Sequence, residues 1–107
     1  MDLHPAIETY FDADREGARD ALTGTFTPDA AVTDEGRTYR GRQAIGDCWT
    51  ETKARYRTVL EPLSADQVDG ATVVEAQVTG DFPGSPAVLK FAFRLDAHGI
   101  SSLEIGA

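Results

Sequence analysis

The sequence predicts an α+β fold in which N-terminal helices lie on one face of a curved, largely antiparallel sheet. Two observations predict this class. The first half of the chain carries apolar residues at helical spacing, whereas the second half holds four segments rich in Val, Thr, Leu, Phe and Ile. The connections between these four segments are short, which favours an antiparallel meander. Helices followed by a run of strands are typical of α+β proteins.

Three helices are expected in the first half. The first is indicated by apolar residues that share one helical face: Leu3, Ile7, Tyr10 and Phe11. Asp2 is its expected N-cap, Gly17 interrupts its pattern, and residues 18–22 suggest a second, short helix. A third helix opens at Gly41 and gives the clearest signal, because its stripe recurs at i, i+3, i+4, i+7 and i+11: Ile45, Cys48, Trp49, Thr52 and Tyr56.

Extended segments account for the remainder of the chain. Thr27-Pro28-Asp29 is a turn signal, residues 31–34 fit a short strand, and Glu35-Gly36 is a tight turn into residues 37–40. Four strands follow in the second half, at 58–69, 71–82, 87–96 and 99–106. Alternation is clearest in the third of these, which directs four side chains to one face: Leu89, Phe91, Phe93 and Leu95.

Composition narrows the classes of partner. A length of 107 residues predicts one domain, residues 1–107, and the net charge of −8 without a basic cluster argues against binding to nucleic acid or to an anionic membrane surface. No apolar run is long enough to span a membrane, and the N-terminus lacks the features of a signal peptide. The single Cys48 fits a reducing compartment. We therefore expect a cytoplasmic protein.

Asp34 is the leading candidate for chemistry. It follows an apolar stretch at the end of a short strand, directly before a turn, where a carboxylate can project between the helices and the sheet. An apolar surrounding would disfavour its ionised form and raise its pKa toward a value useful for proton transfer. The alternative is an ordinary exposed carboxylate in a turn.

Each of the other candidate site residues has a structural interpretation as well as a functional one. The hydroxyl and indole groups of Tyr10, Tyr39, Trp49 and Tyr56 fit either a ligand cavity or a common aromatic core. Glu104, between two apolar residues, belongs either to a solvated face or to a pocket lining. The two histidines lie near the N-terminus and in a turn, so neither a histidine-centred triad nor a metal site is expected.

One stretch of the chain resembles a known family. The string from Phe26 to Gly36 (FTPDAAVTDEG), followed by Tyr39-Arg-Gly41-Arg-Gln-Ala-Ile45, is similar to the pattern F-x-x-D-A-x-V-x-D, then y-x-G-x-x-A-I, of the nuclear transport factor 2-like superfamily, particularly its SnoaL-like branch. The resemblance covers the helical half well, and over the sheet only the order and length of the strands agree.

The resemblance implies a cystatin-like cone, in which the helices and a curved sheet enclose an internal pocket. It implies that Asp34 is a general base and that Tyr10 donates a hydrogen bond to a forming enolate, with no cofactor and no metal. Phe91 occupies the place where ketosteroid isomerase has a second, carboxylic acid donor. The residues expected to line the pocket are Phe11, Tyr39, Trp49, Tyr56, Phe91 and Glu104.

The sequence is compatible with three functions. The first is a cofactor-free lyase or isomerase that acts on a small, largely apolar carbonyl or polyketide-like compound. The second is a noncatalytic protein that binds a small apolar ligand in the same pocket. The third is a dimerisation module that uses the exposed face of the sheet, and a homodimer is expected.

Overall fold

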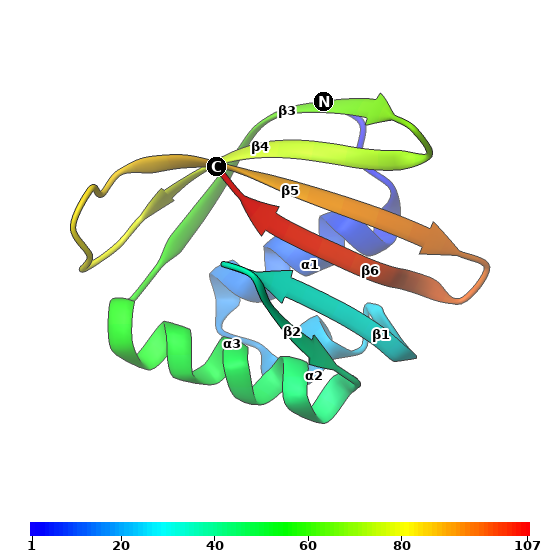
Figure 1. The fold of residues 1–107 in the computed structure, drawn as a ribbon, viewed down its shortest axis with the longest axis horizontal. Helices are drawn as coiled ribbons and strands as arrows, with labels where there is room; N and C mark the ends of the chain where they lie inside the picture. Colours follow the sequence, from blue (N-terminus) through cyan, green and yellow to red (C-terminus); the bar gives the residue numbers. More distant parts are fainter.

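Three helices and a six-stranded sheet make up the computed structural model, which describes residues 1–107 (Figure 1). The helices are α1 (Pro5–Glu16), α2 (Arg19–Thr23) and α3 (Arg42–Tyr56). The strands are β1 (Phe26–Asp34), β2 (Arg37–Arg40), β3 (Val59–Val68), β4 (Ala71–Thr79), β5 (Ala87–Asp96) and β6 (Gly99–Gly106). The order of elements confirms the α+β class.

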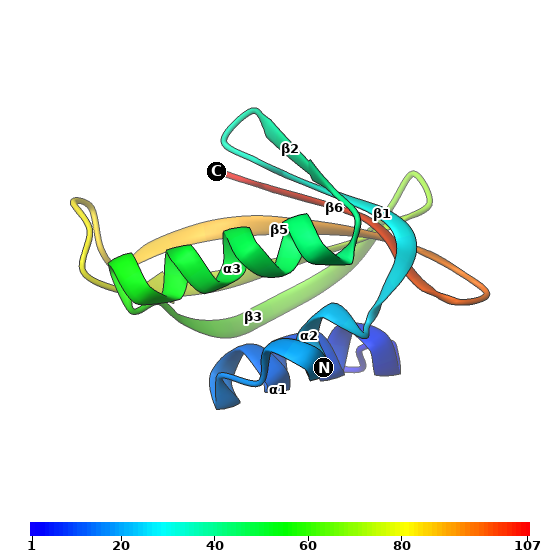
Figure 2. The same cartoon turned by 90° about the horizontal axis from the view of Figure 1, so that it is seen from below.

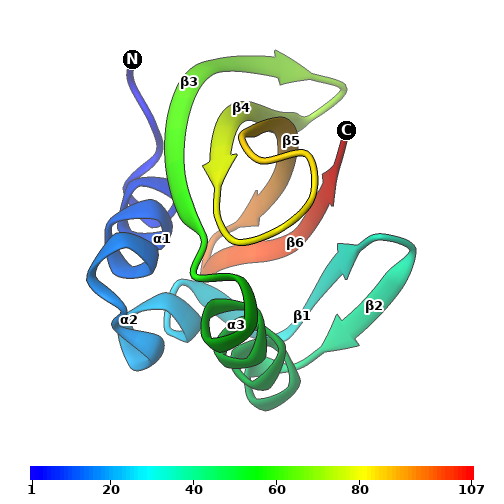
Figure 3. The ribbon, with the colours of Figure 1, turned by 90° about the vertical axis from the view of Figure 1, so that its left-hand side faces the viewer.

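The sheet has the strand order β2-β1-β6-β5-β4-β3. Every pair of neighbours is antiparallel except β1 and β6, which run parallel. The sheet curls without closing, so that its concave face looks toward the helices (Figure 3). Helices α1 and α2 lie side by side below this face, whereas α3 runs along the hairpin of β1 and β2 (Figure 2). The prediction of a curved, largely antiparallel sheet with helices on one face is confirmed.

Local expectations were confirmed in part. Gly17 ends α1 with a left-handed backbone (φ 70°), and its N–H bonds the carbonyls of the preceding turn, as a C-capping glycine does. The N-cap is His4, not Asp2, since Nδ1 of His4 accepts the N–H of Ala6 at 3.0 Å. The prediction of a turn at Thr27-Pro28-Asp29 is also wrong. These residues lie inside β1, where its register with β6 shifts.

Aromatic rings fill the centre of the space between α1 and the sheet. We call them the aromatic cluster: Tyr10, Phe11, Phe26, Phe91 and Phe93. All five are buried, and most of their contacts are edge to face, with centroids 5.3 to 5.9 Å apart. Such contacts add to the stabilisation from area burial alone, so the cluster fixes α1 on the concave face. None of the helices is both long and apolar enough to cross a membrane.

Candidate functional site

The β1–β2 hairpin places two charged residues on the concave face. Its turn is the two-residue segment Glu35-Gly36, with φ values of 52° and 78°, the left-handed pair that a tight hairpin turn requires. The register sets Asp34 opposite Arg37. Val32, two residues before Asp34, is buried against the core, so period-two alternation directs Asp34 and Arg37 to the same concave side.

The carboxylate of Asp34 is half-buried and has no partner. It takes part in none of the three ion pairs of the structure and in no hydrogen bond between protein groups. On β6 its neighbour in the sheet is Ile105, which in turn pairs with Phe91 on β5. Burial in this apolar row raises the pKa of Asp34, and the negative charge of Glu35 raises it further. The carboxylate is therefore poised to accept a proton.

Tyr10 reaches the same region from α1. Its ring is 5% exposed and contacts Phe11, Phe26 and Phe93 at 5.3, 5.9 and 5.4 Å. Burial raises its pKa well above the ordinary value for a phenol, and the charges of Asp14 and then of Asp34 add to the shift. Its hydroxyl makes no hydrogen bond within the protein, yet no fully buried polar side-chain atom lacks a partner. The hydroxyl therefore opens on accessible space, as a neutral donor.

A thiol and a second phenol complete the hairpin side of this region. Tyr39 shares the concave face of β2 with Arg37 and interacts with Cys48 of α3. The Cys48 thiol raises the pKa of Tyr39, an effect that the adjacent Arg37 guanidinium partly offsets. Burial raises the pKa of Cys48, and the charge of Asp34 adds to the shift. These groups thus form one electrostatic neighbourhood with Asp34.

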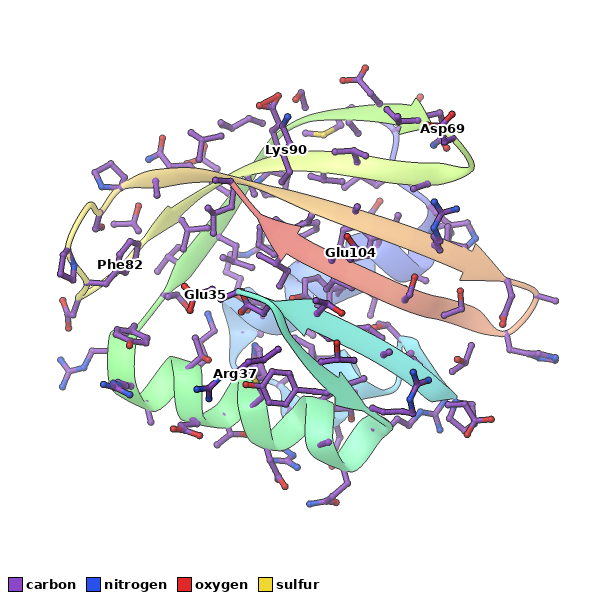
Figure 4. All side chains as sticks on the ribbon, in the orientation of Figure 1. Glu35, Arg37, Asp69, Phe82, Lys90 and Glu104 are labelled. Atoms are coloured by element: carbon purple, nitrogen blue, oxygen red, sulfur yellow. The ribbon has the colours of Figure 1, made fainter.

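The aromatic residues expected to line a pocket fall into two groups. Phe11 and Phe91 belong to the aromatic cluster, with their ring centroids 5.6 Å apart, and Phe91 is the neighbour of Ile105, which lies next to Asp34 in the sheet. Tyr56, at the end of α3, instead meets Phe82 of the β4–β5 connection edge to face at 6.3 Å. Figure 4 shows Phe82 at the same end of the molecule as Glu35 and Arg37. Tyr56 thus packs on Phe82 and lies outside the aromatic cluster.

Trp49 is directed away from the hairpin. Its indole Nε1–H donates to Oδ2 of Asp14 at 2.9 Å, and Lys53 donates to Oδ1 of the same carboxylate at 2.6 Å. Lys53 also donates to the carbonyl of Thr58. These groups line an open surface groove between the ends of α1 and α3. The structure therefore joins Trp49 to Asp14 and not to Asp34.

Glu104 does not line the concave face, and the expectation that it does is wrong. Its neighbour Leu103 is buried, whereas Glu104 is exposed and pairs with Thr33 and Ala92 on the outer side of the sheet (Figure 4). Since successive side chains alternate between faces, a strand that buries Leu103 must turn Glu104 outward.

Arg37 was missed by the sequence analysis, although a signal was present. A two-residue turn at Glu35-Gly36 necessarily places Asp34 and Arg37 opposite each other, so the charge partner could be read from the spacing. No group of three or more His, Cys, Asp or Glu side chains is arranged to hold a metal ion. The chemistry that this arrangement offers is acid–base chemistry beside an apolar wall.

Comparisons with solved structures find proteins of the same fold. A protein of Sinorhizobium meliloti, named as a candidate polyketide cyclase, is 42% identical over 98% of this chain and 96% of its own, with a TM-score of 0.93. A Catenulispora acidiphila protein with a ketosteroid isomerase-like fold, solved with trimethylamine, is 19% identical over 99% of this chain and 87% of its own (TM-score 0.84). A candidate polyketide cyclase of Xanthomonas campestris is 21% identical over 94% and 85% (TM-score 0.77).

The two more distant structures show the fold alone, whereas the first shows kinship along almost the whole chain. This chain belongs to the nuclear transport factor 2-like superfamily. No family model matches the sequence, and no curated protein matches it.

Proposed function

We propose that this chain is a cofactor-free isomerase or lyase that moves a proton at the carbon next to a carbonyl group. The substrate is a small, largely apolar compound of polyketide-like type. The names of the Sinorhizobium meliloti and Xanthomonas campestris proteins support this class, since both are candidate polyketide cyclases.

One observation carries the proposal: a carboxylate without a partner on an apolar concave face. Asp34 has no ion pair and no hydrogen bond, and burial raises its pKa. A general base works best when its pKa approaches the working pH, and removal of such a base lowers turnover by about 10²- to 10⁴-fold. Asp34 takes the proton from the α-carbon to give an enolate. It then returns the proton at another carbon, or passes it to a leaving group that the enolate expels from the β-carbon.

Tyr10 supplies the complementary group. Negative charge develops on the carbonyl oxygen as the proton leaves, and the Tyr10 hydroxyl donates a hydrogen bond to it. Its raised pKa suits this role, because the phenol stays neutral and keeps its proton. The edge contacts of Tyr10 with Phe11 and Phe93 hold the ring in place, so the donor is oriented before the substrate binds.

Deuterium exchange at the α-carbon tests the proposal without knowledge of the natural substrate. Small cyclic ketones such as cyclohexanone and 2-tetralone are incubated with the protein in D₂O, and exchange is followed by NMR. We expect the wild type to accelerate exchange, with a rate that rises with pH as Asp34 ionises and a midpoint above the ordinary Asp range. Asp34→Asn should abolish the acceleration, and Tyr10→Phe should lower it about 10²-fold.

Glu35→Gln is the matched control. It removes the same charge one residue away, on an exposed turn side chain. Exchange should persist in this variant with its midpoint at lower pH, because the charge of Glu35 contributes to the raised pKa of Asp34. An equal loss of exchange in Asp34→Asn and in Glu35→Gln would contradict the role of Asp34 as the base. Ketones that bind at Asp34 without exchange would instead establish a noncatalytic binding protein.

A further inference from the structure

Only two charged residues lie on the concave face of the sheet. The row that crosses it at Asp34 runs from Arg37 through Asp34 and Ile105 to Phe91 and Val74. The other rows of side chains that cross the concave face carry no charge. The charges of β3, β4, β5 and β6 alternate to the outer side, where Figure 4 shows Lys90 and Glu104. One acid and one base thus stand side by side on an otherwise uncharged surface.

These two residues do not neutralise each other. As residues directly opposite in an antiparallel pair, Asp34 and Arg37 have β-carbons about 5 Å apart. Nevertheless, the structure holds only three ion pairs, and neither residue belongs to any of them. Arg37 and Tyr39 share the concave side of β2, because residues two apart in a strand direct their side chains to the same face. Two donors, one of them charged, therefore lie on the same face of the hairpin beside the free carboxylate of Asp34.

The donors match a carboxylate. A guanidinium presents paired N–H groups in the geometry of the two carboxylate oxygens, and the Tyr39 hydroxyl, whose main neighbour is the Cys48 thiol, adds a third donor when it turns from the thiol to the anion. The chain carries a net charge of −8, so most of its surface repels an anion. A positive side chain at the edge of an apolar face is where an anionic group would be held, with the body of the molecule against Ile105 and Phe91.

We propose that Arg37 and Tyr39 bind an anionic oxygen group of the ligand, a carboxylate, so that the substrate class is small carbonyl acids with an apolar body. The anion site stands on the geometry of the hairpin alone, whereas the carbonyl part of the substrate class rests on the proposed function of Asp34.

Binding of benzoate and of its neutral isostere benzamide tests this inference. Affinities are measured by titration of the ¹⁵N-labelled protein at low ionic strength and pH 7. We expect the wild type to bind benzoate more tightly than benzamide, with shifts in the hairpin amides of residues 34–39. Arg37→Gln should weaken benzoate binding at least about tenfold, as expected for loss of hydrogen bonds to a charged group, and should leave benzamide binding nearly unchanged.

Arg40→Gln is the matched control, because Arg40 lies on the same short strand and changes the net charge equally. Its side chain is exposed and donates to the carbonyl of Asp29, on the opposite side from Arg37. Arg40→Gln should retain the benzoate preference. Equal weakening by Arg37→Gln and Arg40→Gln, equal binding of the two ligands, or binding of neither would overturn the anion site.

This experiment separates the two proposals. If ketone exchange depends on Asp34 while Arg37→Gln leaves benzoate binding intact, the anion site fails and the proton transfer stands. If Arg37 selects benzoate but no ketone exchanges, the anion site stands and the catalytic role of Asp34 fails. Tyr39→Phe gives an intermediate loss of benzoate affinity if the hydroxyl is the third donor.

Discussion

Asp14 and Asp34 show two ways in which this fold removes a carboxylate from water. Asp14 lies between α1 and α3, is 4% exposed, and accepts hydrogen bonds from Trp49 and Lys53. Asp34 lies at the hairpin, is half-buried, and accepts none. The first carboxylate joins two helices through donors 35 and 39 residues away in the chain. The second is left with an unfavourable charge.

The contrast indicates how structural and reactive carboxylates can be told apart. Burial alone does not distinguish them, since Asp14 is the more buried of the two. The distinction lies in the partners, because a buried charge is tolerated when donors surround it and is destabilising when they are missing. A buried charge without donors is retained where a function requires it, and this supports the role proposed for Asp34.

The largest effect is expected from Asp14→Ala. This substitution leaves the Lys53 ammonium, which is 20% exposed, without its counter-ion and the Trp49 N–H without an acceptor. Breaking a buried pair by removing one partner lowers the free energy of unfolding by about 3 kcal/mol or more. Urea denaturation followed by circular dichroism measures this change.

Asp12→Ala is the control on the same helix. Asp12 pairs with Arg15 in an ion pair whose side chains are 48% and 59% exposed, and such surface pairs contribute less than about 1 kcal/mol. Comparable losses from Asp12→Ala and Asp14→Ala would contradict the distinction between the two pairs.

A smaller effect of opposite sign is expected from Asp34→Asn. Because the folded-state pKa of Asp34 is raised, the stabilisation linked to its proton is present below the ordinary Asp pKa and is lost as the pH rises through the folded-state pKa. At pH 7 the wild type therefore contains an ionised, poorly solvated carboxylate that the variant lacks. We expect Asp34→Asn to be more stable than the wild type at pH 7, with a gap that narrows toward about pH 4.

Urea denaturation of both proteins across this pH range measures the gap. A gap that widens as the pH falls would mean that Asp34 is stabilised as a carboxylate in the folded protein, contrary to its apolar surroundings at Ile105.

The emission of the single tryptophan should report on Asp14 and not on Asp34. Trp49 donates to Asp14, so Asp14→Asn should shift its emission maximum, whereas Asp34→Asn should leave the spectrum unchanged. Benzoate or ketones bound at the hairpin should likewise cause little quenching. Strong quenching by hairpin ligands would place Trp49 in the same pocket as Asp34. It would contradict the conclusion that the Asp14 and Asp34 regions are separate.

The sequence predicted the sheet well because its signals are local. The alternation of Leu89, Phe91, Phe93 and Leu95 is a property of one strand, and the short connections before and after it fix the neighbouring strands. Pro28 led to the wrong prediction of a turn, because proline is common in turns. In the structure, β1 contains Pro28 at the shift in register between Phe26 and Ala31, a place where a strand tolerates proline.

The site was less accessible from the sequence because it depends on partners far apart in the chain. Asp34 was identified from its place at a strand end, but its lack of partners is visible only in the folded chain. The helical stripe that joined Cys48 and Trp49 turns out to face two ways, with Cys48 toward Tyr39 and Trp49 toward Asp14. Asp14 gave no signal, because its role depends on donors supplied by another helix.

The smallest expected effect concerns Cys48, the only cysteine. Burial raises the pKa of its thiol, and the negative charge of Asp34 raises it further, although interactions with Tyr39 and Thr52 partly offset these shifts. Alkylation proceeds through the thiolate, so Cys48 should react slowly at neutral pH. Asp34→Asn removes one of the repelling charges and should move the pH midpoint of alkylation by iodoacetamide to a lower value.

Asp14→Asn provides the comparison, because it removes a carboxylate from the other region and has no such effect on Cys48. Its midpoint should coincide with that of the wild type as long as the protein stays folded. A shift in the Asp14 variant equal to that in the Asp34 variant would mean that Cys48 senses net charge and not the neighbouring carboxylate. A shift confined to Asp34→Asn would place the thiol and the proposed base in one electrostatic neighbourhood, within reach of the same ligand.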